Sequence, residues 1–305
     1  MTMAVPAEFM PRVRRDEPMS RHTSWHVGGP AEVFFSPRDR ADLAAFMRAL
    51  PPAVPIHWIG LGSNLLVRDG GVRGVVIATS GALERLERAS GSTVYCEAGV
   101  ACARIARQCI RWKLGPAEFF AGIPGTLGGA LAMNAGAFGG ETWRHVAEVE
   151  TLDARGREHR RAASEYEVGY RRVRPPVPGE WFLAASLRFE RTPDSSGAEV
   201  RSLLARRKAS QPIGEWSCGS VFTNPPGDHA ARLIEAAGLK GYRIGDASVS
   251  QKHANFIVNH GAATAADIER LMQHVQSEVT RLLGVALEPE VRILGEPARA
   301  AEGSA

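Results

Sequence analysis

The chain has 305 residues, of which 44% are hydrophobic and 23% are charged, with four cysteines and a formal net charge of +4. This length allows two or three domains with cores of their own, and the composition is that of an ordinary soluble globular protein. The positive charge is mild and scattered, which argues against nucleic acid as a partner. The cysteines show neither paired CxxC ligands nor the density of a disulfide framework, so we expect no metal site and a reduced, cytoplasmic setting.

The first half of the chain predicts a mixed fold that follows an N-terminal extension. Residues 1–20 contain three prolines and several charges but no apolar stretch of signal-peptide length, so we expect this extension to be loosely held. Short apolar runs and helical patterns follow it. Strands are expected at 54–60, 74–78, 93–97 and 147–153, and helices at 38–50 and 101–112. Strands and helices mixed in this way indicate an α+β fold around a sheet.

The second half is predicted to be more helical. The turn-rich stretch 191–197 indicates a domain boundary. Thr264 and Asp267 form a variant of the capping box, and the apolar stripe from Ile268 to Leu283 indicates a core helix. Two shorter helices are expected, at 199–209 and 230–237. The predicted domains are 21–192, with α+β subdomains at about 21–85 and 86–192, and 193–300.

One stretch, 121–140, holds seven glycines in twenty residues and has no charged side chain. Glycine costs conformational entropy, and a chain accepts this cost where the backbone needs a positive φ or where a Cβ would strike a neighbour. Pro124 and the glycines make a poor lipid-exposed helix, and the apolar residues are unlike those of a flexible linker. Two interpretations remain open: a backbone-lined ligand loop, or tight packing within the protein.

A second glycine turn, 60–67 (GLGSNLLV), follows a predicted strand. Its backbone N–H groups could point into one concavity and hold a diphosphate, although a plain turn explains the same residues. Neither glycine stretch has the GxGxxG spacing of a dinucleotide-binding fold or the GxxxxGK[ST] spacing of a P-loop. A nucleotide cofactor would therefore be held by a different fold.

Three further groups could carry chemistry. Arg171 opens an arginine cluster, and a guanidinium is a permanent donor to carboxylate or phosphate. Ser220 lies in a glycine-containing turn, and Glu288 and Glu290 flank a proline before an apparent strand. Each also has an ordinary explanation as solvated charge or a turn hydroxyl.

Taken together, these segments resemble the UDP-N-acetylenolpyruvoylglucosamine reductase family. The resemblance runs in order from residue 23 to residue 295, which is nearly the whole chain. It includes GLGSNLLV, the run PAEFFAGIPGTLGGALAMN at 116–134, GYR at 169–171, CGSVFTNP at 218–225, the span 237–259 and EPEVRILG at 288–295. No single motif is specific, but their joint occurrence is.

The resemblance implies an FAD-binding domain of the vanillyl-alcohol-oxidase (PCMH) type, followed by an α+β substrate-binding domain. FAD would be held non-covalently, largely by backbone groups, which accounts for the glycines without a dinucleotide-binding motif. The residues implied in cofactor binding are Gly60, Gly62, Ser63, Asn64, Leu65, Gly122, Pro124, Gly125, Thr126, Gly128, Gly129, Asn134, Ala135 and Gly136.

The family's reaction is the NADPH-dependent reduction of the enolpyruvyl ether of UDP-N-acetylglucosamine to UDP-N-acetylmuramate, in peptidoglycan precursor synthesis. Hydride passes from flavin N5 to C3 of the enolpyruvyl group, and negative charge then develops at C2 and its carboxylate. The resemblance assigns Arg171 to this carboxylate, Glu290 as its partner, and Ser220 as the acid that protonates C2. Substrate contacts are implied for Tyr170, Arg206, Asn224 and Gln251.

The chain departs from the family pattern in three places, one of which is Thr223, at a position often taken by lysine. Ser210 precedes Gln211 where many members have a basic residue, so Arg206, Arg207 or Lys208 would supply the charge for the substrate diphosphate. No tyrosine lies between Tyr170 and Tyr242, which indicates the shorter type without the tyrosine-bearing loop. The expected partners are the UDP-sugar and NADPH, with no membrane insertion and a monomer favoured.

Two other functions stay open. One is a different flavin oxidoreductase of the same fold, such as an alcohol or sugar oxidase, and the other is a flavin- or nucleotide-binding protein without activity. An oxidase that removes hydride needs a base at the alcohol, whereas this reductase needs an acid at C2. Arg171, Ser220 and Glu290 together therefore favour the reductase.

Overall fold

The computed structural model describes residues 4–193 and 196–298. The chain forms two compact units, each assembled from separate stretches of sequence. The first contains the described parts of Met1–Arg14, Phe34–Leu61 and Gly74–Arg207. The second contains the described parts of Arg15–Val33, Gly62–Arg73 and Lys208–Ala305. The sequence-based division at 192 and 193 differs from this grouping, and the assignment of flavin and substrate domains stays a prediction.

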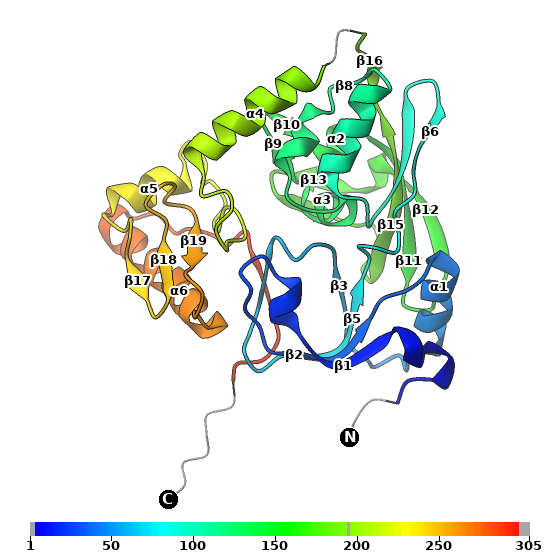
Figure 1. Cartoon of the computed structure of the whole chain (residues 1–305), viewed down its shortest axis with the longest axis horizontal. Coiled ribbons are helices and arrows are strands. Elements are labelled where there is room, and N and C mark those ends of the chain that lie inside the picture. Colours follow the sequence, from blue (N-terminus) through cyan, green and yellow to red (C-terminus); the bar gives the residue numbers. More distant parts are fainter. Residues whose placement is uncertain (1–3, 194–195, 299–305) are drawn as a thin grey trace, which may run out of the picture. The chain divides into compact units, whose positions relative to one another are not determined.

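The first unit is organised around a five-stranded sheet of order β12-β11-β15-β7-β6, in which every neighbouring pair is antiparallel. Helix α3 (Leu127–Met133) packs against β15 and β7 (Figure 1). The core beneath includes the fully buried Ile105, Leu131 and Leu187. The strands and the second helix of this layer are β6 (Leu86–Ser90), β7 (Thr93–Glu97), β11 (Val146–Asp153), β12 (Glu158–Ala162), β15 (Glu180–Arg188) and α2 (Cys102–Arg111).

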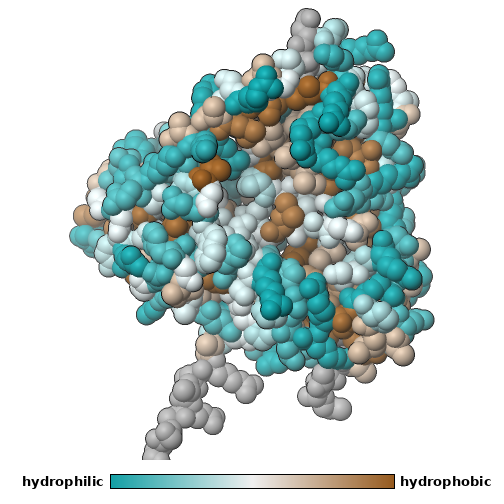
Figure 2. Space-filling view, in the orientation of Figure 1, coloured by the Kyte–Doolittle hydropathy of each residue, from teal (hydrophilic) through white to brown (hydrophobic). Residues whose placement is uncertain are grey.

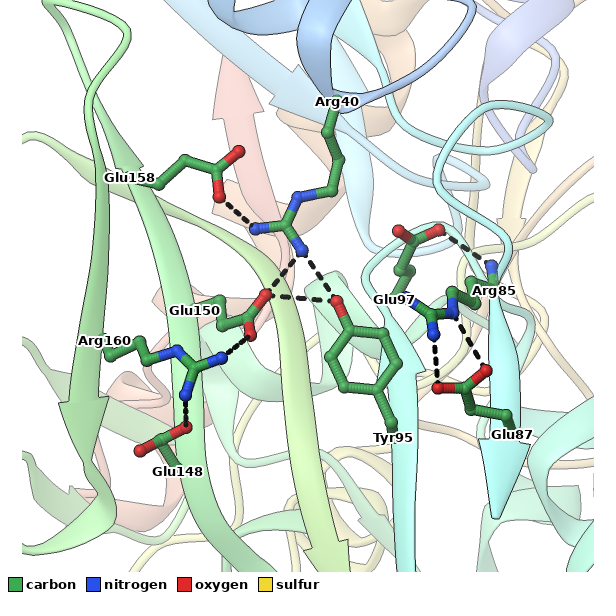
Figure 3. Close-up of polar contacts among 9 residues, drawn as sticks. All are labelled: Arg40, Arg85, Glu87, Tyr95, Glu97, Glu148, Glu150, Glu158 and Arg160. Atoms are coloured by element: carbon green, nitrogen blue, oxygen red, sulfur yellow. Dashed lines mark hydrogen bonds and ion pairs between the residues drawn. The ribbon is translucent and has the colours of Figure 1, made fainter. Parts of the chain in front are cut away.

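Helix α1 (Arg40–Ala49) is tied to this sheet by Arg40, whose side chain reaches three strands. Its guanidinium donates to Glu150 of β11 and to Glu158 of β12, both at 2.5 Å, and to the Tyr95 hydroxyl of β7 at 2.7 Å (Figure 3). Burial would lower the pKa of Arg40, but the bonds to these partners and their charges raise it. Burial also raises the pKa of Tyr95 to about 12, so both groups keep one protonation state near neutral pH.

Among the described residues, ten other strands form a four-stranded sheet and three short pairs. The sheet has the order β1-β2-β5-β3, and β3 runs parallel to β5. Three antiparallel pairs are β9 with β10, β13 with β14 and β8 with β16. These strands are β1 (Val13–Pro18), β2 (Pro30–Phe35), β3 (Ile56–Ile59), β5 (Val72–Ala78), β8 (Leu114–Gly115), β9 (Gly136–Ala137), β10 (Gly140–Glu141), β13 (Glu167–Gly169), β14 (Arg172–Arg174) and β16 (Glu190–Arg191).

The second unit has a core of its own beneath α6 (Ala265–Leu283), which packs against α5 (Ala230–Ala236) and the sheet β17-β18-β19. Trp25, Val27 and Leu66 belong to this core, which explains why two early stretches of sequence join the C-terminal unit. A parallel pair joins β4 to β20. The strands are β4 (Leu65–Val67), β17 (Arg243–Ile244), β18 (Ala247–Val249), β19 (Ile257–Asn259) and β20 (Arg292–Leu294).

Most predicted elements appear within a few residues of their expected bounds, and α4 (Gly197–Ser210) matches the helix expected at 199–209. Two expectations are wrong. The N-terminal extension is ordered from residue 7, because Phe9 and Met19 are buried and anchor two short 3₁₀ helices, Ala7–Arg12 and Met19–His22. The apolar stripe of α6 ends before Leu282 and Leu283, which are 47% and 38% exposed in the final turn.

Most of the surface seen in Figure 2 is hydrophilic, with hydrophobic residues in small groups. Within the described part of the chain, no helix is long and apolar enough to cross a membrane. The glycine-rich stretch 121–140 contributes only the seven-residue α3 and short strands, so it is not a membrane-spanning helix.

Candidate active site

The glycine-rich stretch folds as a compact series of turns around α3. Thr126 is the N-cap of this helix, and Asn134 is its C-cap in the left-handed conformation, with φ 48° and ψ 52°. Beyond the cap, Gly136 and Ala137 pair with Gly140 and Glu141. Asn and Gly are the residues that adopt a left-handed C-cap at least cost.

Several glycines of this stretch are required by packing within the protein. A Cβ at Gly122 would lie 2.5 Å from Phe138 Cε2, and one at Gly136 would lie 2.3 Å from Gly140 O. A Cβ at Gly128 would lie 3.1 Å from the Ala98 Cβ. The packing interpretation therefore explains these three glycines, whether or not a ligand also contacts their backbone.

Gly129 differs from these three glycines, and it lies beside a buried hydroxyl that lacks a partner among the described residues. Apart from the backbone of its own helix, a Cβ at Gly129 would have Thr126 Oγ1 as its nearest neighbour, at 4.0 Å. Thr126 is 1% exposed, and within the described residues its Oγ1 has no hydrogen-bond partner. Gly60 faces the same hydroxyl, because a Cβ there would lie 2.3 Å from it. A buried hydroxyl without a partner, beside bare backbone, suits a polar ligand such as FAD.

The other cofactor candidates of the first unit have defined backbone roles. The Gly125 carbonyl accepts from Cys102 N at 2.9 Å, and Pro124 is exposed. The Ala135 carbonyl accepts from both the N–H and the hydroxyl of Thr142, at 3.0 and 2.7 Å. These contacts fix the path of the backbone through the stretch.

Arg171 lies at the tip of the β13–β14 hairpin with φ +54°, a conformation that a long side chain rarely adopts. Its guanidinium donates from Nη1 to the Asn134 carbonyl at 3.3 Å and from Nη2 to the Gly136 carbonyl at 3.1 Å. The structure thus joins a predicted catalytic residue to the glycine-rich stretch. Tyr170 is 51% exposed, and the Arg171 guanidinium carbon lies 5.2 Å from the centre of its ring.

Arg206 and Arg207 differ in their surroundings. Arg206 is exposed, whereas Arg207 is partly buried and donates from Nη1 to the Gly122 carbonyl at 2.6 Å. Burial lowers the pKa of Arg207. The resemblance pointed to Arg206 for the substrate and gave no indication of this contact of Arg207, since three consecutive basic residues on a helix do not show which one is buried.

In the second unit, Ser220 and Glu290 lie on two neighbouring segments. Phe222 and Pro289 form an antiparallel bridge, and Glu290 N donates to Val221 O at 2.8 Å. Ser220 is preceded by Gly219, whose φ of +83° turns the chain sharply at this point. The structure therefore places Ser220 and Glu290, which are 70 positions apart in the sequence, on two hydrogen-bonded neighbouring segments.

Asn255 holds the Ser220 segment from its other side. Val221 N donates to the Asn255 carbonyl at 2.9 Å, Phe222 N donates to its side-chain oxygen at 3.0 Å, and its side-chain amide donates to Phe222 O at 2.8 Å. Asn255 is 3% exposed. Asn255 is not among the predicted site residues, although a polar amide within an apolar, strand-like run was a usable sign.

The second glycine turn supports the Glu290 segment. Asn64 Nδ2 donates to Glu290 O at 3.1 Å, and Arg292 N donates to Asn64 O at 3.1 Å. Leu65 begins β4, which pairs with β20. Gly62 is required by packing, because a Cβ there would lie 1.8 Å from His22 O. Ser63 lies in the turn between them.

Cys218 is buried close enough to Glu290 for the carboxylate charge to affect its pKa. Burial raises its pKa well above the usual value, and the nearby charge of Glu290 raises it further. A buried thiol of this kind stays protonated near neutral pH, so it provides neither a nucleophile nor a metal ligand. Groups of three or more His, Cys, Asp or Glu suited to a metal do not occur among the residues that the structure describes.

The two remaining substrate candidates have local roles. Asn224 Oδ1 accepts from Ala230 N at 3.0 Å, at the start of α5. Gln251 lies over Gly241, where a Cβ would lie 2.1 Å from its side-chain nitrogen. Both residues are exposed, so substrate contact stays a prediction for each.

Comparison with known proteins gives consistent matches. The model of the UDP-N-acetylenolpyruvoylglucosamine reductase C-terminal domain matches residues 211–294, and that of an FAD binding domain matches residues 31–161. The chain is 60% identical to the UDP-N-acetylenolpyruvoylglucosamine reductase of Alkalilimnicola ehrlichii, over 96% of this chain and 99% of that protein. It is 59% identical to that of Methylococcus capsulatus, over 92% of each.

A solved structure agrees with these sequence matches. The crystal structure of UDP-N-acetylenolpyruvylglucosamine reductase from Thermus caldophilus matches with a TM-score of 0.80 and 33% identity, over 93% of this chain and 99% of that one. The matches confirm the expected fold class, an FAD-binding domain of the PCMH type with a C-terminal α+β domain.

Proposed function

The chain belongs to the UDP-N-acetylenolpyruvoylglucosamine reductase family, and we propose that it reduces UDP-N-acetylglucosamine enolpyruvate to UDP-N-acetylmuramate with NADPH and non-covalent FAD. It is accordingly an FAD-dependent oxidoreductase of peptidoglycan precursor synthesis. The small-molecule partners are the UDP-sugar and NADPH. A cytoplasmic monomer without nucleic-acid partners is part of the same proposal.

The observation that carries the proposal is the pairing of the Ser220 and Glu290 segments. The bond from Glu290 N to Val221 O, with Asn255 on one side and Asn64 on the other, holds a hydroxyl and a carboxylate on adjacent rigid backbone. A binding protein would not need a proton donor and a carboxylate held in this way. Reduction of a carbon–carbon double bond needs a proton donor on one face of the receiving carbon.

FAD, when bound, would take hydride from NADPH and supply it to C3 of the enolpyruvyl group. Arg171 would contact the substrate carboxylate, where its permanent charge stabilises the negative charge that develops next to C2. Ser220 would donate a proton to C2. A serine hydroxyl is a weak acid, but an enolate is a strong base, and Glu290 would act with Arg171 as the carboxylate partner of this site.

One observation supports FAD binding by the proposed residues. The buried Thr126 hydroxyl has no hydrogen-bond partner within the described part of the chain, and it lies beside Gly129 and Gly60. The other proposed FAD contacts are Gly62, Ser63, Asn64, Leu65, Gly122, Pro124, Gly125, Gly128, Asn134, Ala135 and Gly136. For the substrate we propose Tyr170, Asn224 and Gln251, with Arg206 as the basic residue at the diphosphate.

A spectroscopic experiment on the purified protein tests the proposed function. We expect a yellow protein that releases FAD on denaturation, loses its visible absorbance with NADPH in the absence of oxygen, and regains it when the enolpyruvyl substrate is added. A colourless protein that does not bind added FAD contradicts the proposal. Recovery of colour with oxygen but not with the enolpyruvyl substrate would instead indicate an oxidase.

A further inference from the structure

We propose that Asn134 is a positioning residue that holds the turn carrying Arg171 against the end of α3. This inference rests on the proposed function, in which Arg171 contacts the substrate carboxylate. The resemblance to the family implied only a cofactor contact for Asn134. The contacts of its side chain point to a different task.

The Asn134 side chain is 2% exposed and is hydrogen-bonded in both directions. Its amide nitrogen donates to the Gly169 carbonyl at 3.1 Å, and its amide oxygen accepts from Trp143 N at 3.1 Å. The nitrogen also lies 3.4 Å from Glu141 Oε2. Because the Gly169 carbonyl can only accept and the Trp143 N–H can only donate, the amide nitrogen must face Gly169 and the amide oxygen must face Trp143. Asn134 therefore links the hairpin to the body of the unit.

The Asn134 backbone completes the link, because its carbonyl is one of the two that receive the Arg171 guanidinium. The other belongs to Gly136, two residues on, whereas the carbonyl of Ala135 between them faces Thr142. Carbonyl groups that alternate in direction are typical of an extended backbone. Here the alternation presents the Asn134 and Gly136 carbonyls to the planar guanidinium of Arg171. These two contacts fix the plane of the guanidinium without neutralising its charge.

Strand β14 of the hairpin is held by Val173, which packs against the core of the first unit, whereas the residues next to its tip are exposed. Val168 is 40% exposed and Tyr170 is 51% exposed, and no atom lies within 4 Å of a Cβ placed at Gly169. Arg171 also has a positive φ, which must be held by its surroundings. Because the turn beyond Val173 is exposed, we infer that the buried Asn134 amide at the Gly169 carbonyl holds the position of Arg171.

Two substitutions distinguish the contribution of the Asn134 side-chain amide from that of its backbone. Asn134→Gly removes the side chain and keeps the left-handed conformation without strain, which alanine would not. Asn134→Asp keeps the shape and the acceptor for Trp143 N but lacks the donor for the Gly169 carbonyl. Protonation of the new aspartate would restore an O–H donor at that position.

The test measures the two half-reactions of the holoenzyme separately by anaerobic stopped-flow absorbance. The FAD contact proposed for Asn134 would be made by its backbone, which glycine keeps. We therefore expect Asn134→Gly to retain FAD and its rate of reduction by NADPH, while reoxidation by the enolpyruvyl substrate falls by roughly 100-fold. Asn134→Asp should show a similar loss near neutral pH and recover as the pH is lowered. Wild-type protein and Arg171→Lys measured over the same pH range are the controls for this recovery.

A double-substitution cycle tests whether Asn134 acts through Arg171. We expect Asn134→Gly to have little further effect in an Arg171→Lys background, because lysine lacks the planar fork. An equal fold-loss in both backgrounds, loss of FAD in Asn134→Gly, or an unchanged second half-reaction would each overturn the inference. If Arg171→Lys alone leaves the second half-reaction intact, the assigned role of Arg171 in the proposed function fails instead.

Discussion

Gly129→Ala should have opposite effects on the protein alone and on its affinity for FAD. Gly129 lies within α3 at negative φ, and a Cβ there would meet nothing nearer than 4.0 Å. Alanine is favoured over glycine in a helix by about 1 kcal/mol, so the flavin-free protein should become more stable by up to this amount. For a chain of this size the thermal midpoint should rise by roughly 2 °C.

The added methyl group weakens FAD binding only if FAD fills the open space at Gly129. If FAD packs against the Gly129 backbone, an added methyl group in that contact costs about 1–3 kcal/mol. This corresponds to a weakening of the FAD dissociation constant by roughly 5-fold to 150-fold. The contrast is expected because this position is open in the protein alone and would be occupied by FAD in the holoenzyme.

Two measurements check this prediction: thermal unfolding of flavin-free protein by circular dichroism, and titration with FAD by fluorescence. Gly128→Ala is the matched control, because its Cβ would lie 3.1 Å from the Ala98 Cβ and 3.2 Å from the Ala98 carbonyl oxygen, which accepts from Gly128 N. That variant should lower the stability of the flavin-free protein or leave it without gain. Unchanged FAD affinity in Gly129→Ala would refute the reasoning.

Two further predictions concern single polar groups. Thr126→Val removes a buried hydroxyl that has no hydrogen-bond partner among the described residues. The flavin-free protein should therefore become about 1 kcal/mol more stable, while its affinity for FAD falls. An unchanged FAD affinity would show that the hydroxyl does not face the cofactor. Burial would raise the pKa of Glu180, but bonds from Arg161 and Thr151 lower it. Because the folded pKa is depressed, Glu180 stabilises the protein above its unfolded pKa of about 4.3. Glu180→Gln should therefore lower stability by roughly 2 kcal/mol at pH 7, with the difference shrinking as the pH falls below about 4 in thermal melts; a constant difference would contradict it.

Regular elements could be predicted because their signals are local. The helix that begins after Thr264 was identified from its cap, and the structure shows both bonds of the Thr264 and Asp267 capping box. The strand at 93–97 was predicted from a short apolar run and has those bounds. In both cases the information lies within a few consecutive residues.

Tertiary contacts could not be read in the same way. Nothing in the sequence near Trp25 shows that its indole N–H donates to Ile257 O, at 2.7 Å, and so places the stretch 15–33 in the second unit. Likewise, the glycines of 121–140 looked alike in sequence, although packing explains Gly122 and Gly136 and leaves Gly129 open. The residues that contact Trp25 and each of these glycines include ones far away in the sequence, so a local sequence pattern does not reveal them.

The candidate site was predicted by resemblance rather than by pattern. Singly, Arg171, Ser220 and Glu290 had ordinary explanations. The pairing of Ser220 with Glu290 depends on the bridge between Phe222 and Pro289, which joins positions far apart in the chain. The anchors Asn134 and Asn255 were hidden for a related reason, since a buried amide is recognised only when its partners are known.

The most direct test of the proposed chemistry is the rate of each half-reaction in Ser220→Ala, measured by anaerobic stopped-flow absorbance. We predict that NADPH reduces the bound flavin at the wild-type rate, while reoxidation by the enolpyruvyl substrate slows by orders of magnitude, roughly 100-fold to 10,000-fold, because the proton donor to C2 is missing. Equal damage to both half-reactions in a correctly folded, FAD-containing variant would contradict the assignment of Ser220 as that donor.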